Sequence, residues 1–347
     1  MQCEMVIRAD AGEAMGSGHV MRCLALAQAW QETGASACFV SADLPEGLER
    51  RLQGAGFLVH RLGCKAGSLD DATATAGIAQ SLGADWVVID GYQFVDAYSL
   101  ELKRAGLALL AIDDYGHADF GAADVVLNQN LYADRSRYPS VPPDTRILTG
   151  PRYVLLRREF LCWRAWNRPV PPHARKLLIT LGGGDPANTT LKVVEAIAGA
   201  QTFWTQIQVV VGPSYSHEAS LANAIGHIRV PVNVLRNTPS MPDIMADADM
   251  GIVAGGSTCW ETGFMGLPVV VIATAMNQTP IGTAIDNAGL GKYLGWHANV
   301  HPRLVTETLD SMARDLGFRE CVARRGPGLI DGQGARRVVN ALRGELE

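Results

Sequence analysis

His19 stands in the segment MGSGHVMRC (15–23), just behind two glycines and just before a run of helix-forming residues. Gly16 and Gly18 permit backbone conformations that bring a ligand close to the chain. The helix expected after them would favour a negatively charged group near its N-terminus. Two interpretations stay open. His19 is either a polar residue in the first turn of an ordinary helix or a catalytic base held over a bound ligand.

The same segment departs from the dinucleotide fingerprint G-x-G-x-x-G. Met21 stands where the third glycine belongs, and residues 11–16 lengthen the turn after the first strand-like run, MVIRAD. A nicotinamide site needs the glycines tight against that strand. We therefore expect no cofactor of this kind.

A second glycine-rich segment is GGGDPANTT (182–190), which includes Gly183, Gly184 and Asp185. Asp185 is a plausible N-cap with Pro186 at the first helical position, so the segment predicts a strand, a turn and a helix start. Its exposed amide groups would suit a phosphate or a nucleobase. The alternative is a tight turn without a ligand, but three consecutive glycines exceed what a turn requires.

The third segment is AGGSTCWETG (254–263), in which Gly256, Ser257 and Thr258 combine flexible backbone, hydroxyl donors and a helix N-terminus. This combination suits a diphosphate. Glu261 has two interpretations. It could close a capping box with Thr258, which the spacing itself favours, or it could bind ribose hydroxyls.

Polar residues also follow other strand-like runs. Asn277 and Gln278 lie just beyond one such run, as plain loop residues or as hydrogen-bonding groups in a cleft. Asp90, Asp113 and Asp114 lie at strand ends and could line the same cleft. No matching His/Glu cluster accompanies them, so we expect no metal ion.

Short apolar strands alternate with helical patterns of about 10–15 residues, which indicates βαβ units and a parallel sheet. The expected strands are 5–10, 37–41, 57–61, 86–90, 107–113 and 124–128 in the first half, and 176–181, 206–212, 230–236, 250–256 and 267–273 in the second. The pattern restarts after a proline-rich stretch, RPVPPHARK. We therefore expect an α/β protein with two Rossmann-like doubly wound domains facing across a cleft. The expected organisation is a domain at 1–167, a linker at 168–175, a domain at 176–332 and a terminal helix at 333–347.

The net charge, the lengths of the apolar stretches and the cysteine content bear on which classes of function are expected. A net charge of −5 over 347 residues gives no support to nucleic-acid binding, and no apolar stretch is long enough to predict membrane insertion. Charged residues within the first strand speak against a signal peptide. Seven scattered cysteines without a C-x-x-C pair indicate reduced thiols in a cytoplasmic protein and no zinc site. The oligomeric state cannot be read from these features.

With these segments placed, the chain resembles a family of enzymes, the UDP-2,4-diacetamido-2,4,6-trideoxy-β-L-altropyranose hydrolases of pseudaminic acid biosynthesis. That family belongs to the same superfamily as the two-domain GT-B glycosyltransferases. The resemblance rests on ordered blocks along nearly the whole chain: IRADAGEAMGSGHVMRCLALA (7–27), WVVIDGY (86–92), DDYGHADFGAADVVLNQN (113–130), YVLLRREF (153–160), LGGGDPANTT (181–190), GGSTCWE (255–261) and MNQ (276–278).

The resemblance implies a GT-B fold and assigns roles to particular residues. His19 becomes the catalytic base, Arg157 and Glu261 become substrate contacts with the glutamate on the uridine ribose, and Asn277 falls near the sugar or the phosphates. The candidate substrate-binding residues are then Gly16, Gly18, Arg157, Gly183, Gly184, Asp185, Gly256, Ser257, Thr258, Glu261 and Asn277.

The activity that the resemblance implies is hydrolysis of a UDP-linked diacetamido-trideoxy hexose. Water attacks C1 with inversion, and UDP and the free sugar leave. The partner would be a small-molecule UDP-sugar substrate, with no cofactor and no metal. One alternative is a GT-B glycosyltransferase that uses a UDP-amino sugar, since fold and donor would be the same. Another is a non-catalytic protein that binds nucleotide sugars.

Overall fold

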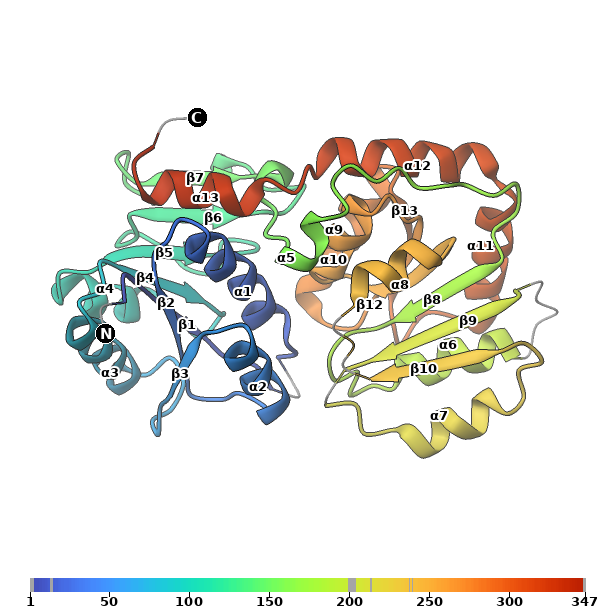
Figure 1. Ribbon diagram of the computed structural model, residues 1–347, viewed down its shortest axis with the longest axis horizontal. Helices are drawn as coiled ribbons and strands as arrows, with labels where there is room; N and C mark the ends of the chain where they lie inside the picture. The colour runs from blue at the N-terminus through green and yellow to red at the C-terminus, as the bar shows by residue number, and fades with distance from the viewer. Residues whose placement is uncertain are drawn as a thin grey trace. The chain divides into compact units, whose positions relative to one another are not determined.

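The computed structural model describes residues 3–12, 15–198, 204–212, 214–236, 238 and 240–345. Contacts divide the chain into two compact units (Figure 1). The first comprises the chain up to Arg158 together with the segment from Gln333 onward, and the second is Glu159–Gly332.

The first unit contains a parallel sheet in the order β3-β2-β1-β4-β5-β6-β7. Its strands are β1 Met5–Ala9, β2 Ala37–Ser41, β3 Leu58–Arg61, β4 Trp86–Asp90, β5 Ala108–Ile112, β6 Val125–Asn128 and β7 Arg146–Thr149. The helices are α1 Gly18–Gln31, α2 Glu46–Gly54, α3 Leu69–Leu82, α4 Asp96–Arg104, α13 Gly334–Leu342 and the short 3₁₀ turns η1 Arg135–Arg137 and η2 Pro151–Tyr153. The short helix α5, Arg158–Leu161, lies where the chain passes from one unit to the next.

Helices cover both faces of this sheet because side chains alternate along each strand. In β1, Met5 and Ile7 share a core with α1, α2 and α13. Val6 points to the opposite face and shares a core with α3 and α4. The first unit is therefore a three-layer α/β/α sandwich.

The terminal helix α13 belongs to the first unit. Val338, Val339 and Leu342 lie in the same buried cluster as residues of α1, and the two helices are in contact (Figure 1). Gly334 approaches the backbone so closely that an added Cβ would lie 2.2 Å from the carbonyl oxygen of Val154. Helix α13, near the end of the chain, thus completes the hydrophobic core to which β1 and α1 contribute.

The second unit contains a parallel sheet in the order β10-β9-β8-β11-β12-β13. Its strands are β8 Lys176–Thr180, β9 Gln206–Val211, β10 Val232–Arg236, β11 Met250–Ala254, β12 Val269–Ala273 and β13 Gly291–Trp296. Its helices are α6 Thr189–Ala198, α7 Glu218–Ile225, α8 Met241–Asp247, α9 Thr258–Phe264, α10 Thr279–Asn287, α11 Pro302–Arg314, α12 Leu316–Leu329 and the 3₁₀ turn η3 Met276–Gln278. One face of the sheet packs its apolar side chains against α6, α7 and α11.

The segment 168–175, which we expected as a linker, lies within the second unit. The guanidinium of Arg168 donates to the carbonyl oxygens of Met245, Ala248 and Met265 at 2.6, 2.5 and 2.8 Å. Burial lowers the pKa of Arg168 to about 10. These bonds hold the start of the segment against α8 and the end of α9.

Both sheets have the doubly wound topology that the alternating pattern predicts. The strand order reverses beside β1 in the first sheet, where β1 pairs with β2 on one side and β4 on the other. It reverses beside β8 in the second sheet, between β9 and β11. In such sheets the loops at the reversal leave in opposite directions and open a crevice at the carboxyl ends of the strands. The segments with predicted chemistry follow β1 and β4 in one unit and β8 and β11 in the other.

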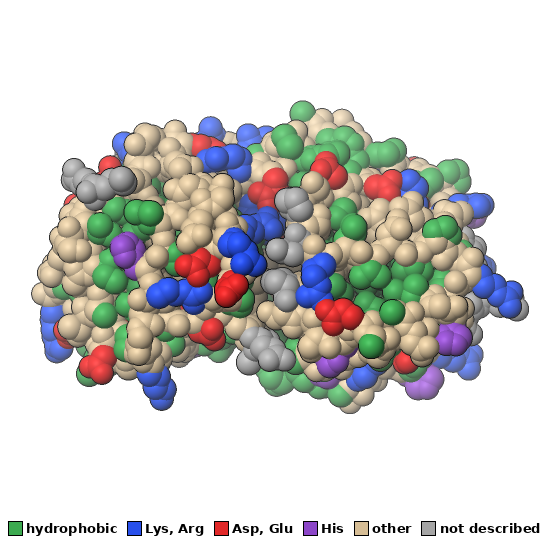
Figure 2. Space-filling view, turned by 60° about the horizontal axis from the view of Figure 1, so that its bottom comes forward, with side chains coloured by type: hydrophobic (Ala, Val, Ile, Leu, Met, Phe, Trp, Pro, Cys, Tyr) green, Lys and Arg blue, Asp and Glu red, His purple; other side chains and the backbone are tan. Residues whose placement is uncertain are grey.

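Acidic and basic side chains are interspersed on the face of the molecule shown in Figure 2, as the small net charge of −5 leads one to expect. Within the described part of the chain, no helix combines the length and the apolar character needed to span a lipid bilayer.

Candidate functional site

The loop after β1 brings His19 to the reversal point of the first sheet. Gly16 has a left-handed backbone (φ 75°), and it exchanges backbone hydrogen bonds of 3.3 and 2.8 Å with Gly12. This small bridge ends just before α1, whose first residue is Gly18 and whose second is His19. The glycine at position 16 is required because residues with a Cβ rarely adopt a positive φ.

Asp90 lies across the same reversal point. It is the last residue of β4, the strand that pairs directly with β1, and its register partner there is Ala9. Oδ1 of Asp90 lies 2.6 Å from Nδ1 of His19. Because the carboxylate is an acceptor, this contact places the imidazole proton on Nδ1. Among the described residues, Nε2 of His19 has no hydrogen-bond partner, so its lone pair is available to a substrate.

Arg22, one helical turn after His19, fixes the carboxylate of Asp90. Its Nε donates to Oδ2 and its Nη2 to Oδ1, each at 2.6 Å. Burial acts to raise the pKa of Asp90, but the charges of Arg22 and His19 outweigh it and hold that pKa well below its usual range. Asp90 is therefore ionised, and its orientation is set by a bidentate ion pair.

A second carboxylate completes the cluster on the other side of Arg22. Nη1 of Arg22 donates to Oδ1 of Asp114 at 2.7 Å, and Oη of Tyr92 donates to Oδ2 at 2.6 Å. The ring of Tyr92 meets the ring of His19 edge to face, with centroids 5.1 Å apart. Two carboxylates and one guanidinium give this buried cluster a net charge of −1.

Together these contacts fix the orientation of the His19 ring, and its role as a catalytic base stays a prediction. Asp90 supports the ring at Nδ1 and would stabilise the imidazolium formed when Nε2 accepts a proton, as the aspartate of a catalytic triad does. The arrangement can remove a proton from a hydroxyl group that approaches Nε2.

In the second unit, the loop after β8 carries Gly183, Gly184 and Asp185. Asp185 has a left-handed backbone (φ 46°), and its two carboxylate oxygens accept the backbone N–H groups of Thr189 and Thr190 at 2.8 and 2.7 Å. The Asp185 carboxylate thus caps the helix, but the prediction that Asp185 takes the N-cap position before Pro186 is wrong, because the helix begins at Thr189. The positive φ values of Asp185 and Asn188 (49°) delay its start.

The same loop lies against the end of β9. A Cβ added to Gly212 would lie 2.1 Å from the carbonyl oxygen of Gly183, so the two backbones touch. The carboxylate of Asp185 is occupied by the helix amides. Contact of Gly183, Gly184 and Asp185 with a substrate stays a prediction.

The loop after β11 brings Gly256, Ser257 and Thr258 to the reversal point of the second sheet. Thr258 is the first residue of α9, and Ser257 takes the N-cap position without a side-chain capping bond. The prediction that Thr258 is the cap residue is therefore wrong by one position. Glu261 lies in the first turn of α9 and is buried, with 9% of its surface exposed.

The loop after β12 packs against the loop after β11. A Cβ on Gly255 would lie 2.7 Å from the carbonyl oxygen of Gln278, and Oε1 of Gln278 accepts the backbone N–H of Thr274 at 2.8 Å. Gln278 is thus a structural residue of its loop, and Asn277, half-buried in η3, lies beside it. The predicted contacts of Asn277 with a sugar or phosphate stay open.

Arg157 lies in the first unit, directly before the division of the chain, and is buried with 8% of its surface exposed. Its predicted contact with a substrate is not tested by this position. No group of three or more His, Cys, Asp or Glu side chains among the described residues is placed to hold a metal ion.

The sequence indicates His19 as a candidate base, but it does not reveal the residues that orient the His19 ring. The sequence indicates Asp90 and Asp114 only as strand-end residues that could line the cleft, and it does not single out Arg22 or Tyr92. The available signals were the i, i+3 spacing of His19 and Arg22, and an aspartate at the end of the strand that follows in the doubly wound order.

Comparisons with known proteins bear on the family and the fold of the chain. Residues 177–295 match the glycosyltransferase family 28 C-terminal domain, and this segment lies wholly within the second unit. Curated relatives match longer parts of the chain at low identity. The uncharacterized protein MJ1062 of Methanocaldococcus jannaschii is 26% identical over 275 residues, 78% of this chain and 55% of that protein.

Two further relatives have descriptive names. The spore coat polysaccharide biosynthesis protein SpsG of Bacillus subtilis is 26% identical over 63% of this chain and 64% of its own length. A UDP-2,4-diacetamido-2,4,6-trideoxy-β-L-altropyranose hydrolase of Campylobacter jejuni is 24% identical over 56% of this chain and 65% of its own length. The matched segments thus span less than two thirds of each relative.

Solved structures establish the fold. MurG of Acinetobacter baumannii is similar with a TM-score of 0.67 at 16% identity, over 98% of this chain and 99% of that one. The spinosyn rhamnosyltransferase SpnG, complexed with thymidine diphosphate, is similar with a TM-score of 0.66 at 17% identity, over 99% of this chain and 100% of that one. With its two parallel α/β domains the chain has the GT-B fold, and the expected fold class is confirmed.

Proposed function

We propose that this protein breaks the bond between C1 of a sugar and the diphosphate of a UDP-sugar, with His19 as the base that activates the attacking hydroxyl group. The observation that carries the proposal is the 2.6 Å contact between Nδ1 of His19 and Asp90, which leaves Nε2 as the acceptor. The position of both residues at the reversal point of a doubly wound sheet supports it, because ligands bind there. The family match in the second unit supports the nucleotide-sugar class.

The proposed reaction is a substitution at C1 that involves no change of oxidation state. The attacking hydroxyl oxygen forms a bond to C1 while its proton passes to Nε2 of His19. The C1–O bond to the diphosphate breaks, and its electron pair leaves with UDP. Attack from the side opposite the diphosphate inverts the anomeric centre.

The second unit supplies the proposed diphosphate and nucleoside contacts. Backbone amides at Gly183, Gly184 and Gly256, with the hydroxyls of Ser257 and Thr258, would stabilise the charge that develops on the leaving diphosphate. Glu261 would bind the ribose, while Asn277 and Arg157 would contact the sugar or phosphates. The proposal requires that His19 reach the sugar of a nucleotide held by these loops.

The comparisons favour glycosyl transfer, in which the attacking group is a hydroxyl of an acceptor molecule. Both the family 28 match and the transferases among the similar structures point this way. In this case Nε2 deprotonates the acceptor hydroxyl, and UDP release depends on the acceptor.

A second candidate is hydrolysis, in which water takes the place of the acceptor. It is favoured by the ordered sequence blocks, which include the histidine segment and YVLLRREF, and by the relative named as a hydrolase. The finer proposal is then hydrolysis of UDP-2,4-diacetamido-2,4,6-trideoxy-β-L-altropyranose to UDP and the free sugar, inverted at C1, on the route to pseudaminic acid. A protein that only binds nucleotide sugars would have no use for an oriented base.

One experiment separates the two candidates. The protein is incubated with the UDP-diacetamido sugar in ¹⁸O-labelled water without any acceptor, and the products are followed by NMR and mass spectrometry. Hydrolysis predicts steady UDP release and one ¹⁸O atom at C1 of the free, inverted sugar. Transfer predicts UDP release only after an acceptor is added. Absence of UDP release with and without acceptors, across a panel of UDP-sugars, would refute the proposed function.

A further inference from the structure

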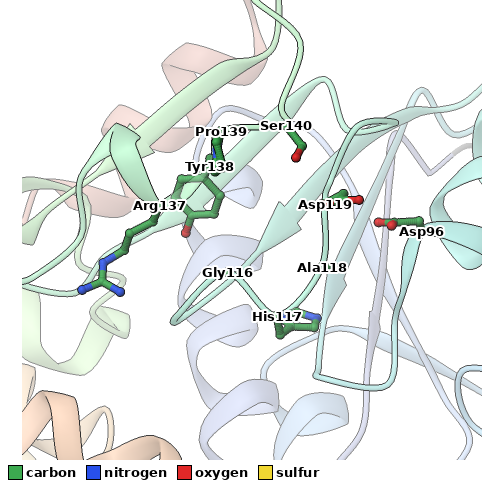
Figure 3. A pocket seen from close by; sticks show the side chains of 9 residues that line it. All are labelled: Asp96, Gly116, His117, Ala118, Asp119, Arg137, Tyr138, Pro139 and Ser140. Atoms are coloured by element: carbon green, nitrogen blue, oxygen red, sulfur yellow. The ribbon is translucent and has the colours of Figure 1, made fainter.

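A second polar pocket lies in the first unit, at the carboxyl ends of β4, β5 and β6. It has a volume of about 400 Å³ (Figure 3). Asp96 reaches it from the start of α4, His117 and Asp119 from the loop after β5, and Arg137 and Ser140 from the segment after β6. None of these residues belongs to the cluster around His19.

His117 is oriented in the same way as His19, by an aspartate at a strand end. Its Nδ1 lies 2.7 Å from Oδ1 of Asp113, whose Oδ2 accepts Oη of Tyr138 and the backbone N–H of Gly116, each at 2.6 Å. Burial acts to raise the pKa of Asp113, but the bonds from His117 and Tyr138 outweigh it and lower that pKa. The ionised carboxylate places the imidazole proton on Nδ1.

Nε2 of His117 is then a buried acceptor without a donor. The side chain is only 7% exposed, and among the described residues the buried Nε2 has no hydrogen-bond partner. Buried polar atoms in folded proteins nearly always have a hydrogen-bond partner, and an unmet acceptor costs free energy. The missing donor is therefore expected from a molecule that enters the pocket.

The remaining lining residues define the class of that molecule. Asp96 and Asp119 add carboxylate acceptors and Ser140 adds a hydroxyl group, while the guanidinium of Arg137 extends away from these groups (Figure 3). Two carboxylates against one guanidinium give a net negative charge, which disfavours phosphates and other anions. A surplus of acceptors suits a ligand with several hydroxyl groups, and the volume falls within the range of small-molecule sites.

We propose that this pocket binds an uncharged polyhydroxylated molecule of monosaccharide size, one hydroxyl of which donates to Nε2 of His117. The ring of Tyr92 meets both imidazoles, with centroids 5.1 Å from His19 and 5.5 Å from His117. The ring of Tyr92 thus links His117, which lines the pocket, to the proposed base His19. Binding itself does not depend on the proposed function. The identity of the bound molecule does rest on the proposed function: if that function holds, the molecule is either the sugar acceptor or the released sugar.

The test uses the full chain with ¹⁵N-labelled histidine, and reads the Nε2 signal of His117 in long-range ¹H–¹⁵N spectra. Comparison with His117→Gln assigns that signal. The probes are glucose, N-acetylglucosamine and rhamnose, with inorganic phosphate as the anionic control. We expect at least one sugar to shift the Nε2 signal saturably, and phosphate neither to shift it nor to compete. Asp119→Ala should weaken that binding about tenfold, the effect of one lost hydrogen bond to a charged group.

Matched variants make each outcome decisive. Asp70→Ala removes an exposed carboxylate from α3 of the same unit and should leave sugar affinity unchanged. A wild-type Nε2 signal that no sugar moves, equal affinity in Asp119→Ala, or displacement of the sugar by phosphate would each overturn the proposal.

His19→Ala separates this inference from the proposed function, since it should lose turnover and keep sugar binding. Sugar binding by a protein that cleaves no UDP-sugar would refute only the proposed function. Adding the bound sugar during UDP-sugar turnover distinguishes its source: a glycoside of that sugar marks an acceptor, and simple inhibition marks a product.

Discussion

Nδ1 of His19 lies 2.6 Å from Oδ1 of Asp90, although 71 positions separate the two residues. They meet because β1 and β4 are neighbours in the sheet and both loops leave from the same edge. Arg22, one helical turn after His19, holds the carboxylate of Asp90 in place with two hydrogen bonds. The orientation of the His19 ring is thus a consequence of the doubly wound strand order.

Asp90→Asn should reduce turnover far more than substrate binding. The amide would no longer hold the proton on Nδ1, and the equivalent change in a catalytic triad lowers kcat by about 10⁴-fold. Steady-state kinetics should show a fall in kcat with KM nearly unchanged. Asp70→Asn, on the exposed side of α3, is the matched control. Turnover close to wild type in Asp90→Asn would mean that Asp90 does not position the base.

The ion pairs around Arg22 should make stability depend on pH in the acid range. The pKa values of Asp90 and Asp114 lie below the ordinary aspartate value, because the charges of Arg22 and of His19 outweigh burial. A carboxyl with a lowered folded-state pKa contributes stability above its unfolded pKa, about 3.9, and loses it as pH falls toward the folded value. The free energy of unfolding in urea should therefore be constant near neutral pH and fall below about pH 4.

Asp90→Asn provides the control for this dependence. At neutral pH it should lose about 3–5 kcal/mol, since Arg22 keeps a buried charge with one partner fewer. Its stability should also fall less steeply in acid than that of the wild type. Parallel pH curves for the two proteins would show that Asp90 titrates as an ordinary exposed carboxyl.

Gly212→Ala should weaken UDP binding if the loop after β8 holds the nucleotide. The new Cβ would lie 2.1 Å from the carbonyl oxygen of Gly183, so the loop must move. We expect a loss of at least about tenfold in UDP affinity, or about 1.4 kcal/mol, by isothermal titration calorimetry. Gly54→Ala, where an added Cβ meets no atom within 4 Å, is the control. Unchanged UDP affinity would remove this loop from the nucleotide site.

Most of the fold could be predicted from hydrophobic patterning, because buried parallel strands are short apolar runs. The expected runs coincide with β1 to β6 and β8 to β12 within one or two residues. Two edge strands were missed. β7 begins with the exposed Arg146, and β13 contains Gly291 and Gly295 and pairs irregularly with β12. An edge strand has a single neighbour, so its sequence is less constrained and its pattern weaker.

The site could be predicted only in part, for a different reason. His19 and the glycine loops are local signals, and each could be recognised within one segment. The contacts of His19 with Asp90, and of Arg22 with Asp114, join residues 71 and 92 positions apart, and they follow from strand order. Asp185 was noted as a capping residue and as a ligand, and its carboxylate is already engaged by the amides of α6.

The most direct test of the account is a single-turnover measurement of UDP release by wild type and His19→Asn, with substrate affinity measured on the same samples. His227→Ala, an exposed histidine of the second unit, serves as control. The account predicts that His19→Asn binds the UDP-sugar nearly as tightly as wild type but releases UDP about 10²–10⁴-fold more slowly, the contribution of one general base. Release by His19→Asn at a rate close to that of wild type would contradict it.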